Sequence, residues 1–197
     1  MDWILRELAA ERLFEDVAVA TGLVYILLIL RRNRWGWVAG AVSSTIFVVF
    51  AARSRLPMQS ALQAYYVVMA VVGWFSWTRN ASEEQGRIHR WPLRNHLFAI
   101  ASILAASAIS ARLLATETHA AWPMLDSLTT WTCLLATWMV TRSLLENWLY
   151  WMVADVVTVF LFGSQGLPRT AGLFCAYAII ACFGLREWLR RYRLQPR

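Results

Sequence analysis

Long apolar stretches separated by short polar ones run through the whole chain. Seven stretches of mostly apolar residues lie at approximately 14–30, 35–52, 57–77, 95–115, 122–141, 147–163 and 168–188. About 20 helical residues cover ~30 Å, the thickness of the hydrocarbon core of a membrane. Backbone polar groups cannot stay unpaired in lipid, so each stretch is predicted to be a helix. The pattern predicts an all-α integral membrane protein with seven transmembrane helices.

The polar separators and the two ends of the chain carry most of the charge and predict which side each loop occupies. They read RRNR at 31–34, ARSRLP at 52–57, RNASEEQGRIHR at 79–90, ATETH at 115–119 and GSQGLP at 163–168. Placing the C-terminus in the cytoplasm puts 13 of the 19 arginines on the cytoplasmic side. Cytoplasmic loops are enriched in basic residues, so we predict the N-terminus outside and the C-terminus inside.

Composition agrees with a membrane protein and argues against other classes. Apolar residues make up 59% and charged residues 16% of the chain, against roughly 25% charged in soluble domains. The net charge of +7 comes from arginine alone, because there is no lysine, and the arginines lie in short loops. This placement sets topology and gives no nucleic-acid site. The three cysteines lie inside apolar stretches without metal-binding spacing, so we expect them to be buried and predict no metal site.

The first residues, MDWILRELAAERLFED, are acidic and amphipathic. A cleavable signal begins with basic residues and continues into an apolar segment, so the first span is expected to stay in the mature protein.

Two parts of the chain resemble each other. Trp35 matches Trp148 at an offset of 113, and after a two-residue gap Pro57, Tyr66, Gly73 and Trp77 match Pro168, Tyr177, Gly184 and Trp188 at an offset of 111. A single helix between two three-helix units keeps both units in the same orientation, which is a parallel 3+1+3 repeat. Such proteins place their substrate near the midplane between the repeats.

The repeat divides the chain into five parts. We predict an N-terminal periplasmic segment at 1–13, a first three-helix repeat at 14–78, a loop with a linker helix at 79–121, a second three-helix repeat at 122–190 and a cytoplasmic tail at 191–197.

One polar stripe stands out in the sixth stretch, ENWLYWMVADVVTVFLF. Trp148, Trp151 and Asp155 are spaced i, i+3 and i+7, and Thr158 continues the stripe. A charge deep in the bilayer costs at least ~2.5–3.5 kcal/mol unless it faces protein or water. Two alternatives remain open: the tryptophans anchor the helix at the membrane surface, and Asp155 bonds another helix. Glu146 is either an acid of the first helical turn or a ligand contact, and Asn147 is either a cap or a ligand contact.

Further polar groups lie on the neighbouring predicted helices. Gln63 and Tyr66 are the deep polar members of a face that ends in Gly73, Trp74 and Trp77. Thr130 follows Asp126 on one face and bonds either a ligand or its own backbone. Tyr177 sits near mid-depth, where its hydroxyl requires a partner. Indoles, amides and one carboxylate suit a flat heteroaromatic ring joined to a sugar, and a cationic ring would add cation–π attraction.

QAYYVVMAVVGWFSW at 63–77, ENWLYWMVAD at 146–155, Tyr177 and GLREW at 184–188 resemble the PnuC family of bacterial vitamin transporters. The resemblance extends from about Glu15 to Trp188 and includes the signature E-x-W-x-x-W-x-x-x-D. It implies a 3+1+3 fold similar to SWEET sugar transporters, without a cofactor. It also implies uptake of nicotinamide riboside across the bacterial inner membrane by facilitated diffusion, trapping by cytoplasmic phosphorylation, and a homotrimer in membrane lipid.

The resemblance also selects site residues. It marks Gln63, Trp148, Trp151, Asp155 and Tyr177 as pocket residues, with Asn147 beside them. Ser43 stands where relatives often carry asparagine, which predicts a different sugar contact or a different vitamin.

Three other functions remain open from the sequence. The first keeps transport and changes the cargo to thiamine, riboflavin or another heteroaromatic vitamin. The second is a membrane-embedded enzyme that uses Asp155 and Asp126 as acid and base, although no catalytic motif supports it. The third is a structural membrane subunit.

Overall fold

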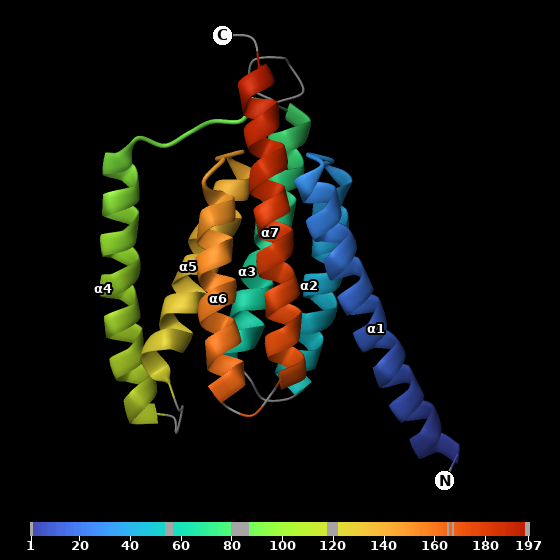
Figure 1. The fold of residues 1–197 in the computed structure, drawn as a ribbon. Coiled ribbons are helices and arrows are strands. Elements are labelled where there is room, and N and C mark those ends of the chain that lie inside the picture. Colours follow the sequence, from blue (N-terminus) through green and yellow to red (C-terminus); the bar gives the residue numbers. More distant parts are fainter. Residues whose placement is uncertain are drawn as a thin grey trace. The chain divides into compact units, whose positions relative to one another are not determined.

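The helices of the computed structural model follow the predicted spans closely. It describes residues 2–53, 57–79, 87–117, 122–164, 166 and 168–195. The described residues form seven helices: α1 Asp2–Leu30, α2 Trp35–Arg53, α3 Pro57–Arg79, α4 Leu93–Glu117, α5 Pro123–Thr141, α6 Asn147–Ser164 and α7 Pro168–Leu194 (Figure 1). Three of them begin at a proline, which has no N–H to leave unpaired in a first turn. The largest difference is α1, which begins at Asp2 instead of near residue 14, because the amphipathic stretch before the span continues the helix.

The chain separates into two compact units, Met1–Gly86 and Arg87–Arg197. In the first, α2 packs against both α1 and α3. In the second, α5 lies between α4 and α6, and α6 also packs on α7 (Figure 1). The boundary falls inside the predicted linker 79–121, and α4 belongs with the second unit.

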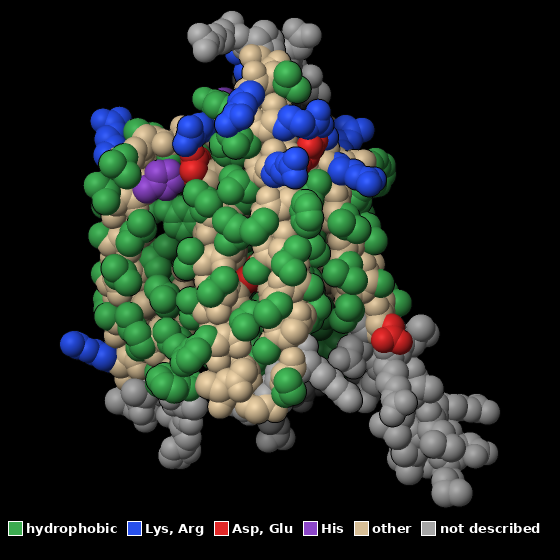
Figure 2. All heavy atoms as spheres, in the orientation of Figure 1, with side chains coloured by type: hydrophobic (Ala, Val, Ile, Leu, Met, Phe, Trp, Pro, Cys, Tyr) green, Lys and Arg blue, Asp and Glu red, His purple; other side chains and the backbone are tan. Residues whose placement is uncertain are grey.

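The outer surfaces of the helices suit a membrane. Within the described residues, three stretches are long and apolar enough to cross a bilayer: Leu93–Leu113, Asn147–Ser164 and Ala171–Leu194. Asp16–Leu30 and Trp35–Phe50 are shorter apolar helices. In each unit hydrophobic side chains cover the middle of the helices, and arginines lie towards the helix ends (Figure 2). On α4, Leu97, Phe98 and Ile109 are each more than 60% exposed, as expected for side chains in contact with lipid.

A tryptophan set against a glycine joins α2 to α3. Trp37 is 2% exposed and lies where a Cβ atom on Gly73 would overlap its ring. The ring also meets Trp77 edge to face, with centroids 5.3 Å apart and planes at 82°. Small residues allow membrane helices to approach closely, and here the space above the glycine is filled by an indole.

The second unit repeats this arrangement between α6 and α7. Trp148 is 4% exposed, covers Gly184 and meets Trp188 edge to face at 5.6 Å and 85°. The counterpart of Trp148 is therefore Trp37, and the predicted pairing with Trp35 is wrong. All matched positions share the single offset of 111, and no gap is needed. Trp35 instead is 56% exposed and contacts Trp74.

Ser43 joins α2 to α1. Its hydroxyl, in a residue 7% exposed, donates a hydrogen bond of 2.8 Å to the carbonyl oxygen of Ala18. Gly22 leaves room for it, because a Cβ there would lie 3.1 Å from the Ser43 Oγ atom. The hydroxyl thus has a structural partner within the first unit.

We expect Ser43→Ala to reduce the free energy of unfolding by about 0.5–1.5 kcal/mol, the net contribution of one hydrogen bond. Affinity for a ligand of the predicted site should stay unchanged, because the hydroxyl proton is donated to Ala18. Thermal unfolding in detergent and calorimetric titration measure the two quantities, and Thr45→Ala, at an exposed position of α2, is the control. Lost affinity at unchanged stability would place the hydroxyl on the ligand.

The cysteines correct another expectation. Cys133 is partly buried, whereas Cys175 and Cys182 lie on exposed faces of α7, so the expected burial is wrong for these two. An apolar stretch in a membrane helix includes a lipid-facing side, and its composition alone does not distinguish that side from the protein-facing one.

Candidate functional site

The polar stripe predicted on α6 lies on its buried face. Trp148, Asp155 and Thr158 are buried together with Ala154 and Leu161, and Trp151 is partly buried. The opposite face is exposed and apolar, with Leu149, Val153, Val156 and Phe160 between 44% and 61% exposed. The outward face is apolar, and the inward face mixes polar with apolar residues, unlike a soluble helix, whose polar residues face outward.

Asp155 is a buried carboxylate without an ionic partner in the described part of the chain. Its residue is 5% exposed, and no described side chain forms an ion pair or a hydrogen bond with it. Thr158, one turn on, donates 2.7 Å to the carbonyl oxygen of Ala154 and is thus occupied. Tyr177 on α7 lies within electrostatic range of Asp155. A carboxylate in this position requires a proton, water or a bound polar group, because burial without one is costly.

The two tryptophans of the stripe have different surroundings. Trp148 is enclosed by Gly184 and Trp188, and its indole N–H has no partner in the described residues. Trp151, on the next turn towards Asp155, is only partly buried. Part of Trp151 therefore stays uncovered within the described residues, whereas the ring of Trp148 is packed against Gly184 and Trp188.

Asn147 is the first residue of α6 and is fully buried. Its amide nitrogen donates to the carbonyl oxygen of Leu144, which closes the preceding turn. Its Oδ1 atom has no hydrogen-bond partner in the described residues. The predicted cap is not formed, because a capping side chain accepts a backbone N–H through its oxygen, whereas here the nitrogen donates to the preceding turn. The ligand contact stays a prediction.

The other predicted site residues lie on α3, α5 and α7. The hydroxyl of Thr130 donates 2.9 Å to the carbonyl oxygen of Asp126, as in the backbone alternative, while a ligand contact through its oxygen stays a prediction. Tyr177 is partly buried, and its ring meets Phe174 at 5.7 Å and 88°. In the first unit, Gln63 and Tyr66 are partly buried on α3, and Tyr66 contacts Tyr65 at 6.1 Å.

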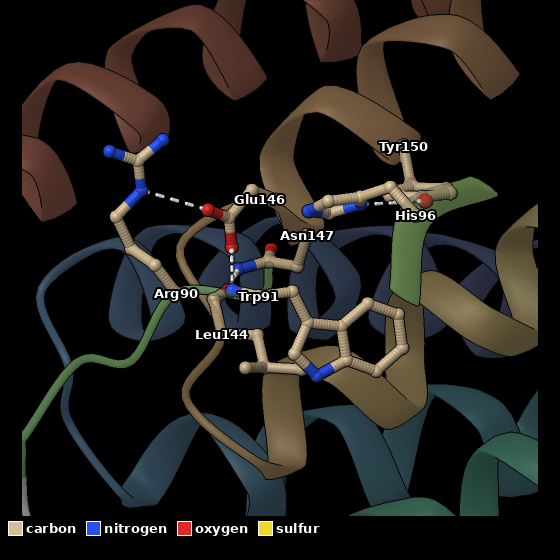
Figure 3. A network of polar contacts seen from close by, with 7 residues as sticks. All are labelled: Arg90, Trp91, His96, Leu144, Glu146, Asn147 and Tyr150. Atoms are coloured by element: carbon tan, nitrogen blue, oxygen red, sulfur yellow. Dashed lines mark hydrogen bonds and ion pairs between the residues drawn. The ribbon is translucent and has the colours of Figure 1, made fainter. Parts of the chain in front are cut away.

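Glu146 does not act as an acid of the first helical turn. Helix α6 begins one residue later, and the side chain of Glu146 binds Arg90 and the backbone N–H of Trp91 (Figure 3). Sequence reasoning missed these partners because they lie 56 and 55 residues away along the chain. The one available signal was a glutamate directly before an apolar helix, together with arginines in the polar segment before α4.

Comparison with known proteins gives consistent results. The chain matches the family described as nicotinamide mononucleotide transporter over residues 12–190. It is 24% identical over 205 residues to the nicotinamide riboside transporter PnuC of Escherichia coli, covering 91% of this chain and 86% of that protein. It is 25% identical over 183 residues to the riboflavin/roseoflavin transporter RibM of Streptomyces davaonensis, covering 89% and 84%.

A solved structure shares the fold. The crystal structure of the vitamin B3 transporter PnuC superposes with a TM-score of 0.73 at 18% sequence identity, covering 98% of this chain and 92% of that chain. The family match extends from α1 to α7 and includes both tryptophan–glycine pairs. The chain is thus a membrane protein that belongs to the nicotinamide mononucleotide transporter family.

Proposed function

We propose that the chain takes up nicotinamide riboside across the bacterial inner membrane by facilitated diffusion, and that cytoplasmic phosphorylation traps the product. The observation that carries the proposal is the unpaired, buried carboxylate of Asp155 on the same face as the partly buried Trp151. Nicotinamide riboside joins a flat cationic ring to a neutral sugar. An indole and a carboxylate together attract such a ring by stacking, cation–π contact and charge.

Each proposed contact is assigned from the polar atoms or ring surface of a side chain that other described residues do not cover. Trp151 stacks on the nicotinamide ring, and Asp155 binds the ring cation or ribose hydroxyls. Tyr177 and the Oδ1 atom of Asn147 serve the remaining polar groups of the ligand. The faces of Trp148 support this site through packing, which leaves its N–H as its one ligand contact. Thr130 contributes only its hydroxyl oxygen, because the hydroxyl proton is donated to Asp126.

The proposed repeat adds contacts from the first unit. We infer a parallel 3+1+3 repeat with the ligand near the membrane midplane, and Gln63 and Tyr66 of α3 are the ligand contacts that we propose for the first unit. The uniform offset of 111 and the identical tryptophan–glycine pairs of the two units support two copies of one three-helix motif.

The arginines support a topology with the N-terminus outside and the C-terminus inside. In the second unit Arg90, Arg94 and Arg142 flank the start of α4 and the end of α5, which is also the end where α7 finishes with several arginines. In the first unit Arg31, Arg32, Arg34 and Arg79 lie at the end where α1 and α3 finish. Basic residues are favoured on the cytoplasmic side.

A second cargo is favoured by one observation. RibM, named as a riboflavin/roseoflavin transporter, is about as similar to this chain as PnuC is, at 25% against 24% identity. Riboflavin also combines a flat ring with a hydroxylated chain, although its ring is neutral. Thiamine carries a cationic ring and would use Asp155 in the same way.

A binding and uptake experiment with purified protein tests the cargo. We expect calorimetric titration to show nicotinamide riboside binding, with thiamine and riboflavin about tenfold weaker, or ~1.4 kcal/mol. The ring of riboflavin lacks the charge that attracts Asp155, and thiamine lacks the ribose hydroxyls that would bind the remaining polar groups. Proteoliposomes should accumulate intact riboside to the outside concentration, as mass spectrometry of their contents will show. Tighter binding of thiamine or riboflavin would change the cargo, and chemically altered riboside would favour an enzyme.

A further inference from the structure

The segment before α4 is attached to the start of α6 at several points, all within the second unit. Residues 87–92 run extended before α4 begins at Leu93. The backbone of His89 donates 3.0 Å to Ser143, and Leu145 donates 2.9 Å back to His89. These two bonds form a short parallel bridge between the segment and the turn that joins α5 to α6.

Glu146 is the charged centre of this attachment. Its Oε1 atom accepts 2.9 Å from the Arg90 Nε atom, and its Oε2 atom accepts 3.3 Å from the backbone N–H of Trp91 (Figure 3). The Glu146 side chain is 6% exposed, whereas that of Arg90 is 56% exposed. Both carboxylate oxygens are thus committed to one neighbouring segment. Charge-assisted hydrogen bonds of this kind are stronger than neutral ones.

Aromatic contacts extend the attachment into α4 and the first turn of α6. The Tyr150 hydroxyl lies 3.0 Å from the Nδ1 atom of His96, and the two rings stack with planes at 23°. Trp91 fills the space between His96 and Trp138 of α5, at centroid distances of 5.6 and 5.7 Å. The segment is therefore held both before and after the point where α6 begins.

Two of the residues proposed to bind the ligand, Asn147 and Trp151, directly follow residues of this attachment. The carbonyl oxygen of Glu146 accepts the first helical bonds of α6, from Leu149 at 3.0 Å and Tyr150 at 3.4 Å. Asn147 follows Glu146 directly, and Trp151 follows Tyr150. Any shift of Glu146 or Tyr150 moves both neighbours, because a helical turn behaves as one rigid piece.

We propose that residues 87–96 and the turn 143–146 form a latch that sets the position of the first turns of α6, with Glu146 as a positioning residue for ligand binding. This inference rests on the proposed function, since it assigns ligand contacts to α6. It gives the glutamate of E-x-W-x-x-W-x-x-x-D a role without ligand contact. Glu146 fixes the start of α6 and thereby the position of the polar stripe on that helix. The segment before α4 thereby contributes to the site without touching the substrate.

Glu146→Gln tests the latch with little change in shape. The amide would point an N–H₂ donor at either Arg90 or the Trp91 N–H, so one of the two bonds is lost. We expect faster hydrogen exchange in peptides covering 88–91 and 143–150, and ligand affinity weakened about tenfold, the scale of one hydrogen bond to a charged group. Arg90→Gln should also weaken binding and speed exchange, because it removes the ion pair and leaves the bond from the Trp91 N–H to Glu146.

Glu187→Gln is the matched control. Glu187 pairs with Arg190 and Arg191 at 2.9 and 2.7 Å, so these ion pairs lie in the same unit but entirely within α7. The substitution should leave both exchange in 143–150 and affinity unchanged. Unchanged exchange in Glu146→Gln would refute the latch, and faster exchange with unchanged affinity would refute the positioning role. If the wild-type protein binds none of the vitamins, the proposed function and the positioning role fail, and exchange alone still decides whether the latch exists.

Discussion

Replacing Gly184 by alanine is expected to destabilise the protein by roughly 1–3 kcal/mol, the usual cost of overpacking a filled site. The new Cβ atom would lie 2.5 Å from the Cε3 atom of Trp148, closer than real contacts allow. The indole cannot move aside easily, because its ring is buried and meets Trp188 edge to face. The measurement is thermal unfolding in detergent, monitored by the loss of the monodisperse peak in size-exclusion chromatography.

The chain provides controls for this substitution. Gly172 is on the same helix, and nothing lies within 4 Å of a Cβ added to it. Gly172→Ala should therefore be neutral or slightly stabilising, because alanine has the better helix propensity by ~1 kcal/mol. Gly73→Ala should reproduce the loss in the first unit, since its Cβ would overlap Trp37. A Gly184→Ala protein as stable as Gly172→Ala would show that the Trp148 ring has room to shift.

Replacing Trp151 by alanine is expected to weaken ligand binding by ~1–3 kcal/mol, roughly 5- to 150-fold in dissociation constant, while expression is retained. The reason is that Trp151 is partly buried on the stripe of Asp155, where we propose that it stacks on the ligand. Calorimetric titration of the purified variant with nicotinamide riboside provides the measurement. Trp122→Ala is a suitable control, because Trp122 is 45% exposed and contacts Phe160 on the outer face.

Trp148→Ala should reduce stability more than affinity, whereas Trp151→Ala should reduce affinity and leave expression unchanged. Removing a large buried aromatic ring costs ~3–5 kcal/mol of stability, and Trp148 is 4% exposed against Gly184 and Trp188. The expected result is a large fall in unfolding temperature or expression, with a smaller effect on the affinity of the folded fraction. Unchanged affinity in Trp151→Ala would remove that residue from the site and leave the stripe without its stacking surface.

The helices were predictable because every backbone N–H and C=O group within lipid must be hydrogen-bonded inside the span. Prolines 57, 123 and 168 begin α3, α5 and α7, and arginine-rich loops mark several other ends. The start of α1 was missed, since an amphipathic segment continues a helix without any change in backbone bonding.

The candidate site was predictable in part. Helical spacing placed Trp148, Trp151 and Asp155 on one stripe, and that stripe lies on the buried face of α6. Spacing did not distinguish the packed Trp148 from the more accessible Trp151, because their surroundings come from α7. It also aligned the repeat on Trp35, whereas the contacts with Gly73 identify Trp37.

The sequence by itself determined the class of the protein, its seven helices and the polar face of α6, because hydropathy and a period of 3.6 residues are local properties. Only the tertiary structure decided which tryptophan packs over which glycine. It also decided that Ser43 donates a hydrogen bond to Ala18 and that Glu146 accepts hydrogen bonds from Arg90 and Trp91. These contacts join residues from 25 to 56 positions apart. Such pairings depend on how helices pack against one another, and no local pattern in a single chain specifies them.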